Sequence, residues 1–145
     1  MLEFGTVYWK PGSKSIGSPE EHFLVVLAVD EVNKQVWYQT FSSQIKHIFQ
    51  FPGEKAPYVD VDAVAFINPQ KYSYFSRNTC IMMMYGVTKE NKAVFEQNVA
   101  NNNYKFQGKI IDHNKKSLML SLKCATEYKL SESERLRILN HYSTS

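Results

Sequence analysis

The chain contains few cysteines and none of the spacings that make cysteine informative. Only two occur, Cys80 and Cys124, each inside an apolar run, and neither has a CxxC partner or a nearby histidine at metal-ligand spacing. Free cysteine is among the most buried residue types, so two reduced thiols in a hydrophobic core are the simplest interpretation. We therefore expect no disulfide framework, no metal centre and no cofactor.

Several targeting and catalytic signatures are also missing. The N-terminal segment lacks the basic residues and long apolar run of a signal peptide, and no window reaches the ~20 apolar residues of a membrane span. No glycine-rich phosphate loop, GxSxG elbow or HExxH motif occurs. Without repeats, low-complexity tracts or linkers, residues 1–145 are predicted to form a single domain. We expect that domain to be cytoplasmic, with no membrane partner.

The chain has no strong charge of one sign, but it is rich in aromatic residues. Its formal net charge is +3, which permits a polyanionic partner without requiring one, since dedicated nucleic-acid binders are usually more basic. Nine tyrosines, nine phenylalanines and two tryptophans are present. Such side chains fill β-rich cores, and they can also stack on nucleic-acid bases.

Short apolar runs separated by turn residues predict a mainly β structure. The strongest pair, His22–Asp30 and Gln35–Ser42, flanks a turn at Glu31–Lys34 and predicts a hairpin. A second hairpin is predicted around the sequence HNKK, from Tyr104–Asp112 and Ser117–Ala125. The other predicted strands are Phe4–Trp9, Val59–Ile67 and the strongly apolar run Thr79–Val87.

Two helices complete the prediction. The first spans residues 88–101, with Thr88 as its N-cap and with Val94, Phe95 and Val99 on one face. The second spans residues 131–142 and begins with a capping box, Ser131 and Glu134; its predicted inner face is Leu136, Leu139 and Tyr142. Together these elements predict a mainly β domain with α additions, in which six or seven strands form a small SH3-like antiparallel barrel or a strongly bent sheet.

The most informative polar residues lie at the open end of the first hairpin. In a tight hairpin, His22 and Ser42 lie roughly opposite one another. Histidine exchanges a proton near neutral pH, and nearby hydroxyls and amides can hold a phosphate or a carbonyl oxygen. Both residue types are also common at strand ends without any chemical role, and the sequence leaves both interpretations open. The accompanying polar residues are Thr40, Ser43 and Gln44, with Lys10 and Lys14 on the preceding loop.

A second polar group is the segment KYSYFSR, residues 71–77. Lys71 and Arg77 bracket Tyr72, Tyr74 and Phe75. Bases of single-stranded RNA stack on such rings while cations contact phosphate. The alternative is a segment whose aromatic side chains pack inward. The run Met82–Met84 has two interpretations as well, a core segment or an apolar sheet edge that forms a dimer interface.

The stretch HFLVVLAVD, followed by VWYQTFSSQIKH, resembles the MazF/PemK-like toxins over residues 4–47. Gly5–Trp9 matches the first strand of that family. His22 and Phe23 stand where the family has Arg-Pro, and Ser42 takes the place of its catalytic threonine. The resemblance implies an SH3-like barrel and a metal-independent endoribonuclease that acts on single-stranded RNA.

On this resemblance, His22 and Ser42 are the expected catalytic residues, with His22 as acid or base and Ser42 as a phosphate donor. Because histidine lacks the planar fork of arginine, the pattern supports the barrel better than the reaction. The alternative is a non-catalytic SH3-like binding or adaptor protein that uses the same edge. The expected partners are single-stranded RNA, a small acidic antitoxin protein and a second copy of the chain. The expected substrate-binding residues are Lys10, Lys14, Thr40, Ser43, Gln44, Lys46, Lys71, Tyr74 and Arg77.

Overall fold

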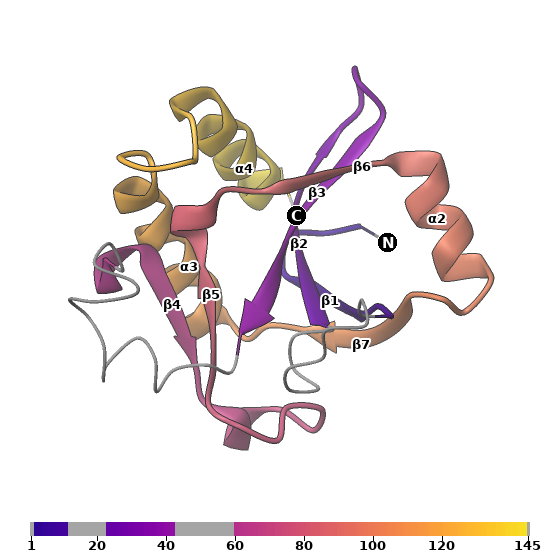
Figure 1. Ribbon diagram of the computed structural model, residues 1–145, viewed down its shortest axis with the longest axis horizontal. Helices are drawn as coiled ribbons and strands as arrows, with labels where there is room; N and C mark the ends of the chain where they lie inside the picture. The colour runs from indigo at the N-terminus through magenta and orange to yellow at the C-terminus, as the bar shows by residue number, and fades with distance from the viewer. Residues whose placement is uncertain (1, 12–22, 43–59, 145) are drawn as a thin grey trace.

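The computed structural model describes residues 2–11, 23–42 and 60–144. In these residues a seven-stranded sheet carries helices on both of its faces (Figure 1). The strands are β1 Thr6–Trp9, β2 Phe23–Asp30, β3 Gln35–Ser42, β4 Val64–Ile67, β5 Thr79–Met82, β6 Thr88–Asn91 and β7 Lys105–Lys109. The α-helices are α2 Lys92–Ala100, α3 Asp112–Ala125 and α4 Glu132–Thr144, and the 3-10 turns are η2 Val61–Ala63, η3 Pro69–Lys71 and η4 Met83–Tyr85.

The predicted mainly β fold with added helices is confirmed. The strand order is β4-β5-β3-β2-β1-β7, each neighbouring pair is antiparallel, and β6 pairs with the first half of β3. Within the described residues the sheet does not close into a barrel, because β4 and β7 remain at opposite ends of this order. Of the two predicted architectures, the structure is therefore consistent with the strongly bent sheet.

The first hairpin forms as predicted. β2 and β3 pair from Asp30 opposite Gln35 to Leu24 opposite Thr40, with a shift of register between Val26 and Ala28. The buried Asp30 carboxylate closes the turn, because its Oδ1 accepts hydrogen bonds of 3.1 Å from the backbone N–H groups of Val32 and Asn33. Aspartate favours such turns for this reason.

Two cores lie on opposite faces of the hairpin. Val25 and Leu27 belong to the larger core with α3 and α4, whereas Leu24 and Val26 belong to a smaller core with α2. Figure 1 shows α3 and α4 on one side of β2 and β3, and α2 on the other. A strand covered on both faces reads as a continuous apolar run, which explains the sequence FLVVLAV.

The run Thr79–Val87 is not one strand, as predicted, but an interrupted one. β5 pairs with Phe41 and Ser42, and β6 pairs with residues 35–38, so residues 82–87 have only Gln39 and Thr40 opposite them on β3. Met82 also pairs with Val64 of β4. The extra chain length folds into η4, whose C-cap is Gly86 with a φ of +79°. Met83 and Met84 are buried in the larger core, so the core interpretation of the methionine run is confirmed.

The helix predicted over residues 88–101 exists, but its predicted start is wrong. Residues 88–91 continue the sheet as β6, and α2 begins at Lys92. The N-cap is Asn91, whose Oδ1 accepts a 3.1 Å hydrogen bond from the Val94 N–H. Both Thr88 and Asn91 suit an N-cap, and pairing with β3 decides between them.

The second predicted hairpin is wrong. Residues 105–109 form β7, which pairs with β1, and residues 112–125 form α3. Leu118, Leu122 and Ala125 are fully buried in the larger core, a spacing that fits one face of a helix. The apolar segment SLMLSLKC is short enough to fit a strand as well as a helix, so its pattern alone does not distinguish the two.

The capping box that begins α4 is confirmed. The Glu134 N–H donates to Ser131 Oγ at 3.1 Å, and the Ser131 N–H donates to Glu134 Oε1 at 2.8 Å. The predicted inner face is wrong in part, because Ile138 is fully buried while Leu136 is 55% exposed. Among the described residues, no helix combines the length and the apolar character that crossing a membrane requires.

Candidate functional site

The structure places six of the predicted site residues. Lys10 follows β1, Thr40 and Ser42 end β3, and Lys71, Tyr74 and Arg77 lie between β4 and β5. In the described part of the hairpin, Leu24 lies opposite Thr40. The expectation that His22 lies opposite Ser42 assumes that this pairing continues for two more residues. The remaining predicted residues, His22, Lys14, Ser43, Gln44 and Lys46, lie outside the described residues.

Lys10, Tyr38, Thr40 and Ser42 form a polar strip on the face of the sheet that carries α2. Lys10 Nζ donates a 3.1 Å hydrogen bond to the Tyr38 hydroxyl and lies 5.2 Å from the centroid of its ring. Because side chains alternate along a strand, Thr40 and Ser42 project to the same side as Tyr38. Thr40 and Ser42 are both half-buried, which places a cation and three hydroxyls along one line.

Neighbouring side chains fix the backbone of this strip. Gln39 Oε1 accepts a 2.8 Å hydrogen bond from the Thr40 N–H, and Gln39 Nε2 donates to the Gly86 carbonyl at 2.5 Å. At the end of β3, the Thr79 hydroxyl donates to the Ser42 carbonyl at 2.7 Å. A rigid strand end of this kind holds the hydroxyls in a defined geometry, as binding or catalysis requires.

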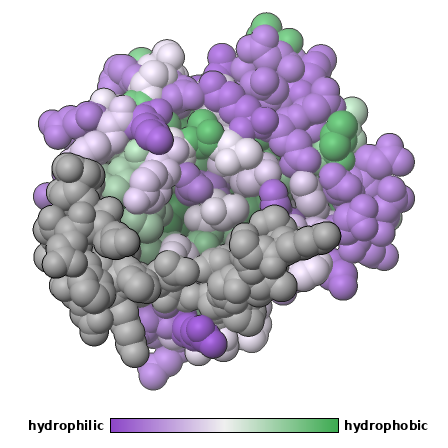
Figure 2. Space-filling model, in the orientation of Figure 1, coloured by the Kyte–Doolittle hydropathy of each residue, from purple (hydrophilic) through white to green (hydrophobic). Residues whose placement is uncertain are grey.

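Exposed aromatic side chains lie at both ends of the same face. Phe106 on β7 is 61% exposed and pairs with Tyr8, the residue two places before Lys10. Phe66 on β4 is 38% exposed and pairs with Cys80, which in turn pairs with Ser42. Figure 2 shows a hollow near the middle of the visible surface where weakly polar and apolar residues gather. Exposed rings that flank a polar strip are suited to stack on bases.

The segment with Lys71 and Arg77 does not join the polar strip. The Tyr74 ring lies 5.9 Å from the ring of Phe23 and 4.8 Å from that of Phe75, both residues of the larger core. Burial raises the pKa of Tyr74, and its hydroxyl is buried without a partner in the described part of the chain. Tyr74 and Phe75 therefore pack inward, on the opposite face of the sheet, while Lys71 and Arg77 are exposed.

The described residues offer no alternative chemical centre based on a metal or a thiolate. Among them, no group of three histidine, cysteine or acidic residues is arranged to hold a metal ion. Burial raises the pKa of the Cys80 thiol to about 12, so this thiol stays protonated near neutral pH.

Comparison with known proteins assigns the chain to no family. The sequence matches no protein-family model, and a search of curated proteins finds no relative. Function is therefore inferred from the residues of the polar strip and their surroundings.

Three residues of this face were not singled out in the sequence, namely Tyr38, Phe66 and Phe106. The alternation in QVWYQTFS contains the signal for Tyr38, because it puts Tyr38, Thr40 and Ser42 on one side of a strand. Phe106 could not be found in this way, because its strand pairs with β1 rather than with the neighbouring segment.

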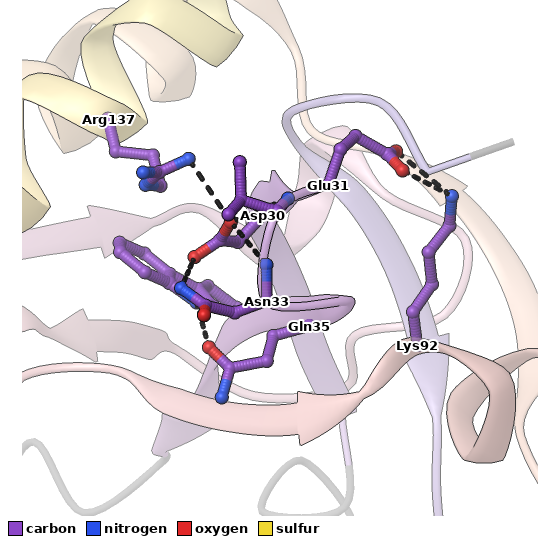
Figure 3. A network of polar contacts seen from close by, with 8 residues as sticks. Asp30, Glu31, Asn33, Gln35, Lys92 and Arg137 are labelled. Atoms are coloured by element: carbon purple, nitrogen blue, oxygen red, sulfur yellow. Dashed lines mark hydrogen bonds and ion pairs between the residues drawn. The ribbon is translucent and has the colours of Figure 1, made fainter.

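A polar network at the tip of the hairpin holds the sheet against two helices (Figure 3). Asp30 accepts a 2.8 Å hydrogen bond from Asn33 Nδ2, and Arg137 of α4 lies 3.4 Å from its other oxygen. Lys92 of α2 pairs with Glu31 at 2.9 Å. The hydrogen bonds from Asn33, more than the charge of Arg137, keep the pKa of Asp30 below its ordinary value.

We expect Asp30→Ala to lower the free energy of unfolding by about 1–3 kcal/mol at pH 7, since the turn loses the buried acceptor of three hydrogen bonds. Because the folded pKa of Asp30 is depressed, its contribution is present above the unfolded pKa of about 3.9 and is lost as pH falls through the folded value. Urea unfolding at pH 7 and pH 3 should therefore show a smaller difference between variant and wild type at the lower pH. Asp62→Ala, at an exposed aspartate, is the matched control, and an equal loss at both pH values would contradict the assignment.

Proposed function

We propose that this protein binds single-stranded RNA along the polar strip and cleaves it without a metal ion, as an endoribonuclease of toxin type. The observation that carries the proposal is the line formed by Lys10, Tyr38, Thr40 and Ser42 between two exposed phenylalanine rings. The ammonium and hydroxyl groups suit phosphates, and the rings suit unpaired bases.

The proposed reaction uses the RNA's own 2′-hydroxyl. Its oxygen attacks the adjacent phosphorus, the bond from phosphorus to the 5′-oxygen breaks, and the products carry a 2′,3′-cyclic phosphate and a 5′-hydroxyl. One group takes the proton of the 2′-hydroxyl, and another gives a proton to the departing 5′-oxygen. His22 is proposed for one of these two proton transfers. Ser42 is proposed as a hydrogen-bond donor to a non-bridging oxygen, because a serine hydroxyl stays protonated near neutral pH.

Lys10 is the proposed charge partner that the structure describes. Its ammonium now donates to the neutral Tyr38 hydroxyl at 3.1 Å. A phosphate oxygen is a stronger acceptor than a neutral hydroxyl, because hydrogen bonds between charged groups are roughly twice as strong. Bound RNA would therefore draw Lys10 toward the phosphate and leave Tyr38 as a second donor. Lys14 and Lys46 are the other proposed charge partners.

The same proposal includes two protein partners. A toxin of this type would be held inactive by a small acidic antitoxin protein, and the net charge of +3 is of the sign that suits such a partner. A homodimer is the second prediction, since β4 and β7 lie at opposite ends of the strand order in the described residues.

Non-catalytic binding by the same face is the second candidate function. One observation favours it: none of the four side chains of the polar strip is a histidine or a carboxylate. If His22 makes no contribution, the strip has a cation and donors for RNA but no ready proton acceptor.

The proposal is tested by incubating the purified protein with unstructured RNAs of varied sequence in EDTA. We expect fragments that end in a 2′,3′-cyclic phosphate and begin with a 5′-hydroxyl, as read by mass spectrometry. Binding without fragments would favour the non-catalytic function. Neither binding nor cleavage would overturn both candidates.

A further inference from the structure

A cavity of about 500 Å³ opens between α2, the strands β1 and β2, and α4. None of the four residues of the polar strip lines it. Its size falls in the range of small-molecule pockets, about 300–1,000 Å³. Apolar residues make up one part of the wall, namely Leu2, Tyr8, Val29, Phe95, Val99 and Ala100; the polar part consists of Glu31, Lys92, Glu96 and His141.

The apolar part of this cavity is built from the smaller core. Phe95 is fully buried, and its ring meets that of Tyr8 edge to face at 5.4 Å. Leu2 and Val99 are partly buried against the same core. Tyr8 and Phe95 therefore lie beneath the wall, and an apolar body entering the cavity would pack on the partly exposed Leu2 and Val99, which the buried rings support.

The polar part of the cavity carries an excess of negative charge. Lys92 Nζ binds both carboxylate oxygens of Glu31, at 2.9 and 3.2 Å, so these two charges offset one another (Figure 3). Glu96 lies one helical turn after Lys92 on α2 and lines the same cavity. Within the described residues its carboxylate makes no hydrogen bond, and it interacts with Lys92 only electrostatically. His141 is held by a 2.9 Å contact between its Nε2 and the Leu2 carbonyl oxygen.

We infer that this cavity binds a small organic cation with an aromatic body. The ammonium of such a ligand would pair with Glu96, the carboxylate to which Lys92 donates no hydrogen bond. Its ring would pack against Leu2, Val29 and Val99, the partly exposed apolar side chains of the wall. An anionic ligand of the same shape would instead meet two carboxylates and one ammonium. The cavity should therefore bind the cation more tightly than the anion.

The test uses the whole chain and two indoles of similar size and opposite charge. Tryptamine and indole-3-acetate are titrated separately, with binding followed by backbone amide shifts in NMR spectra. We expect tryptamine to shift the amides of residues 92–100 and to bind at least tenfold more tightly than indole-3-acetate. Equal affinities would overturn the charge assignment, and absence of shifts at these residues would overturn the cavity as a binding site.

Two variants test separately whether tryptamine binding needs the charge of Glu96 and whether it needs the space of the cavity. Glu96→Gln keeps the shape of an exposed side chain and should weaken tryptamine about tenfold, whereas Glu127→Gln, at an exposed glutamate outside the cavity, should leave its affinity unchanged. Val99→Trp should fill the space and abolish binding, with circular dichroism as the check on folding. An unchanged affinity in Glu96→Gln would contradict the inference even if Val99→Trp failed to fold. RNA cleavage is not part of this test, so its outcome and that of the proposed function are independent.

Discussion

Replacing Phe95 by alanine is expected to lower the free energy of unfolding by about 3–5 kcal/mol. Phe95 is the one residue of α2 that is fully buried. Its ring contacts three tyrosine rings, those of Tyr8 at 5.4 Å, Tyr38 at 6.1 Å and Tyr104 at 5.0 Å. Truncation therefore removes the aromatic contacts and leaves a cavity at the centre of the smaller core.

The effect should be large because the other contacts of α2 are weaker: the Lys92–Glu31 ion pair is exposed to solvent, and Val99 is only partly buried. A helix of nine residues is too short to be stable in isolation, so it depends on the face that it buries. Urea unfolding followed by circular dichroism gives the free energy, and amide hydrogen exchange reports whether residues 92–100 lose protection first. Val94→Ala, one residue earlier and 51% exposed, is the control and should change stability by less than about 0.5 kcal/mol. A loss below 1 kcal/mol in Phe95→Ala would show that other contacts anchor α2.

His22→Ala and Ser42→Ala are each expected to lower RNA cleavage strongly. Loss of a general acid or base costs about 100- to 10,000-fold in rate, and loss of one donor to the developing charge costs about 100- to 1,000-fold. Initial rates on an unstructured RNA in EDTA give these ratios. RNA binding should change far less than the rate, because Lys10 and the exposed rings of Phe66 and Phe106 remain.

Matched variants distinguish chemistry from general damage. His113→Ala and Ser73→Ala remove the same side-chain types at exposed positions outside the polar strip and should leave cleavage unchanged. Thermal melting of all four variants checks that each still folds. Wild-type rates in both His22→Ala and Ser42→Ala would place any cleavage elsewhere and end the proposed assignment.

The elements that could be predicted from the sequence are those encoded by local signals. A continuous apolar run before a short turn and a largely apolar segment after it define β2 and β3, and Asp30 and Asn33 supply the turn's own hydrogen bonds. Likewise Ser131 and Glu134 are close enough in sequence to cap α4 by themselves. In both cases the deciding interactions join residues at most a few positions apart.

Other elements were decided by contacts that a local pattern does not contain. The segment 117–125 fits either a strand or a helix, and burial of Leu118 and Leu122 in the larger core selects the helix. Residues 88–91 carry suitable cap residues for a helix, but pairing with β3 keeps them extended. These outcomes depend on partners distant in the chain, so neither propensity nor spacing could settle them.

The candidate site divides in the same way. That Thr40 and Ser42 share one side of a strand follows from the order of residues alone, because strand alternation is a property of the backbone. The contact of Lys10 with Tyr38, and the positions of Phe106 and Phe66 at the two ends of that face, depend instead on how the strands are arranged in space. Those neighbours come from β1, β7 and β4, and the order of strands in a sheet is set by where apolar faces can be buried together, not by the residues of any single strand.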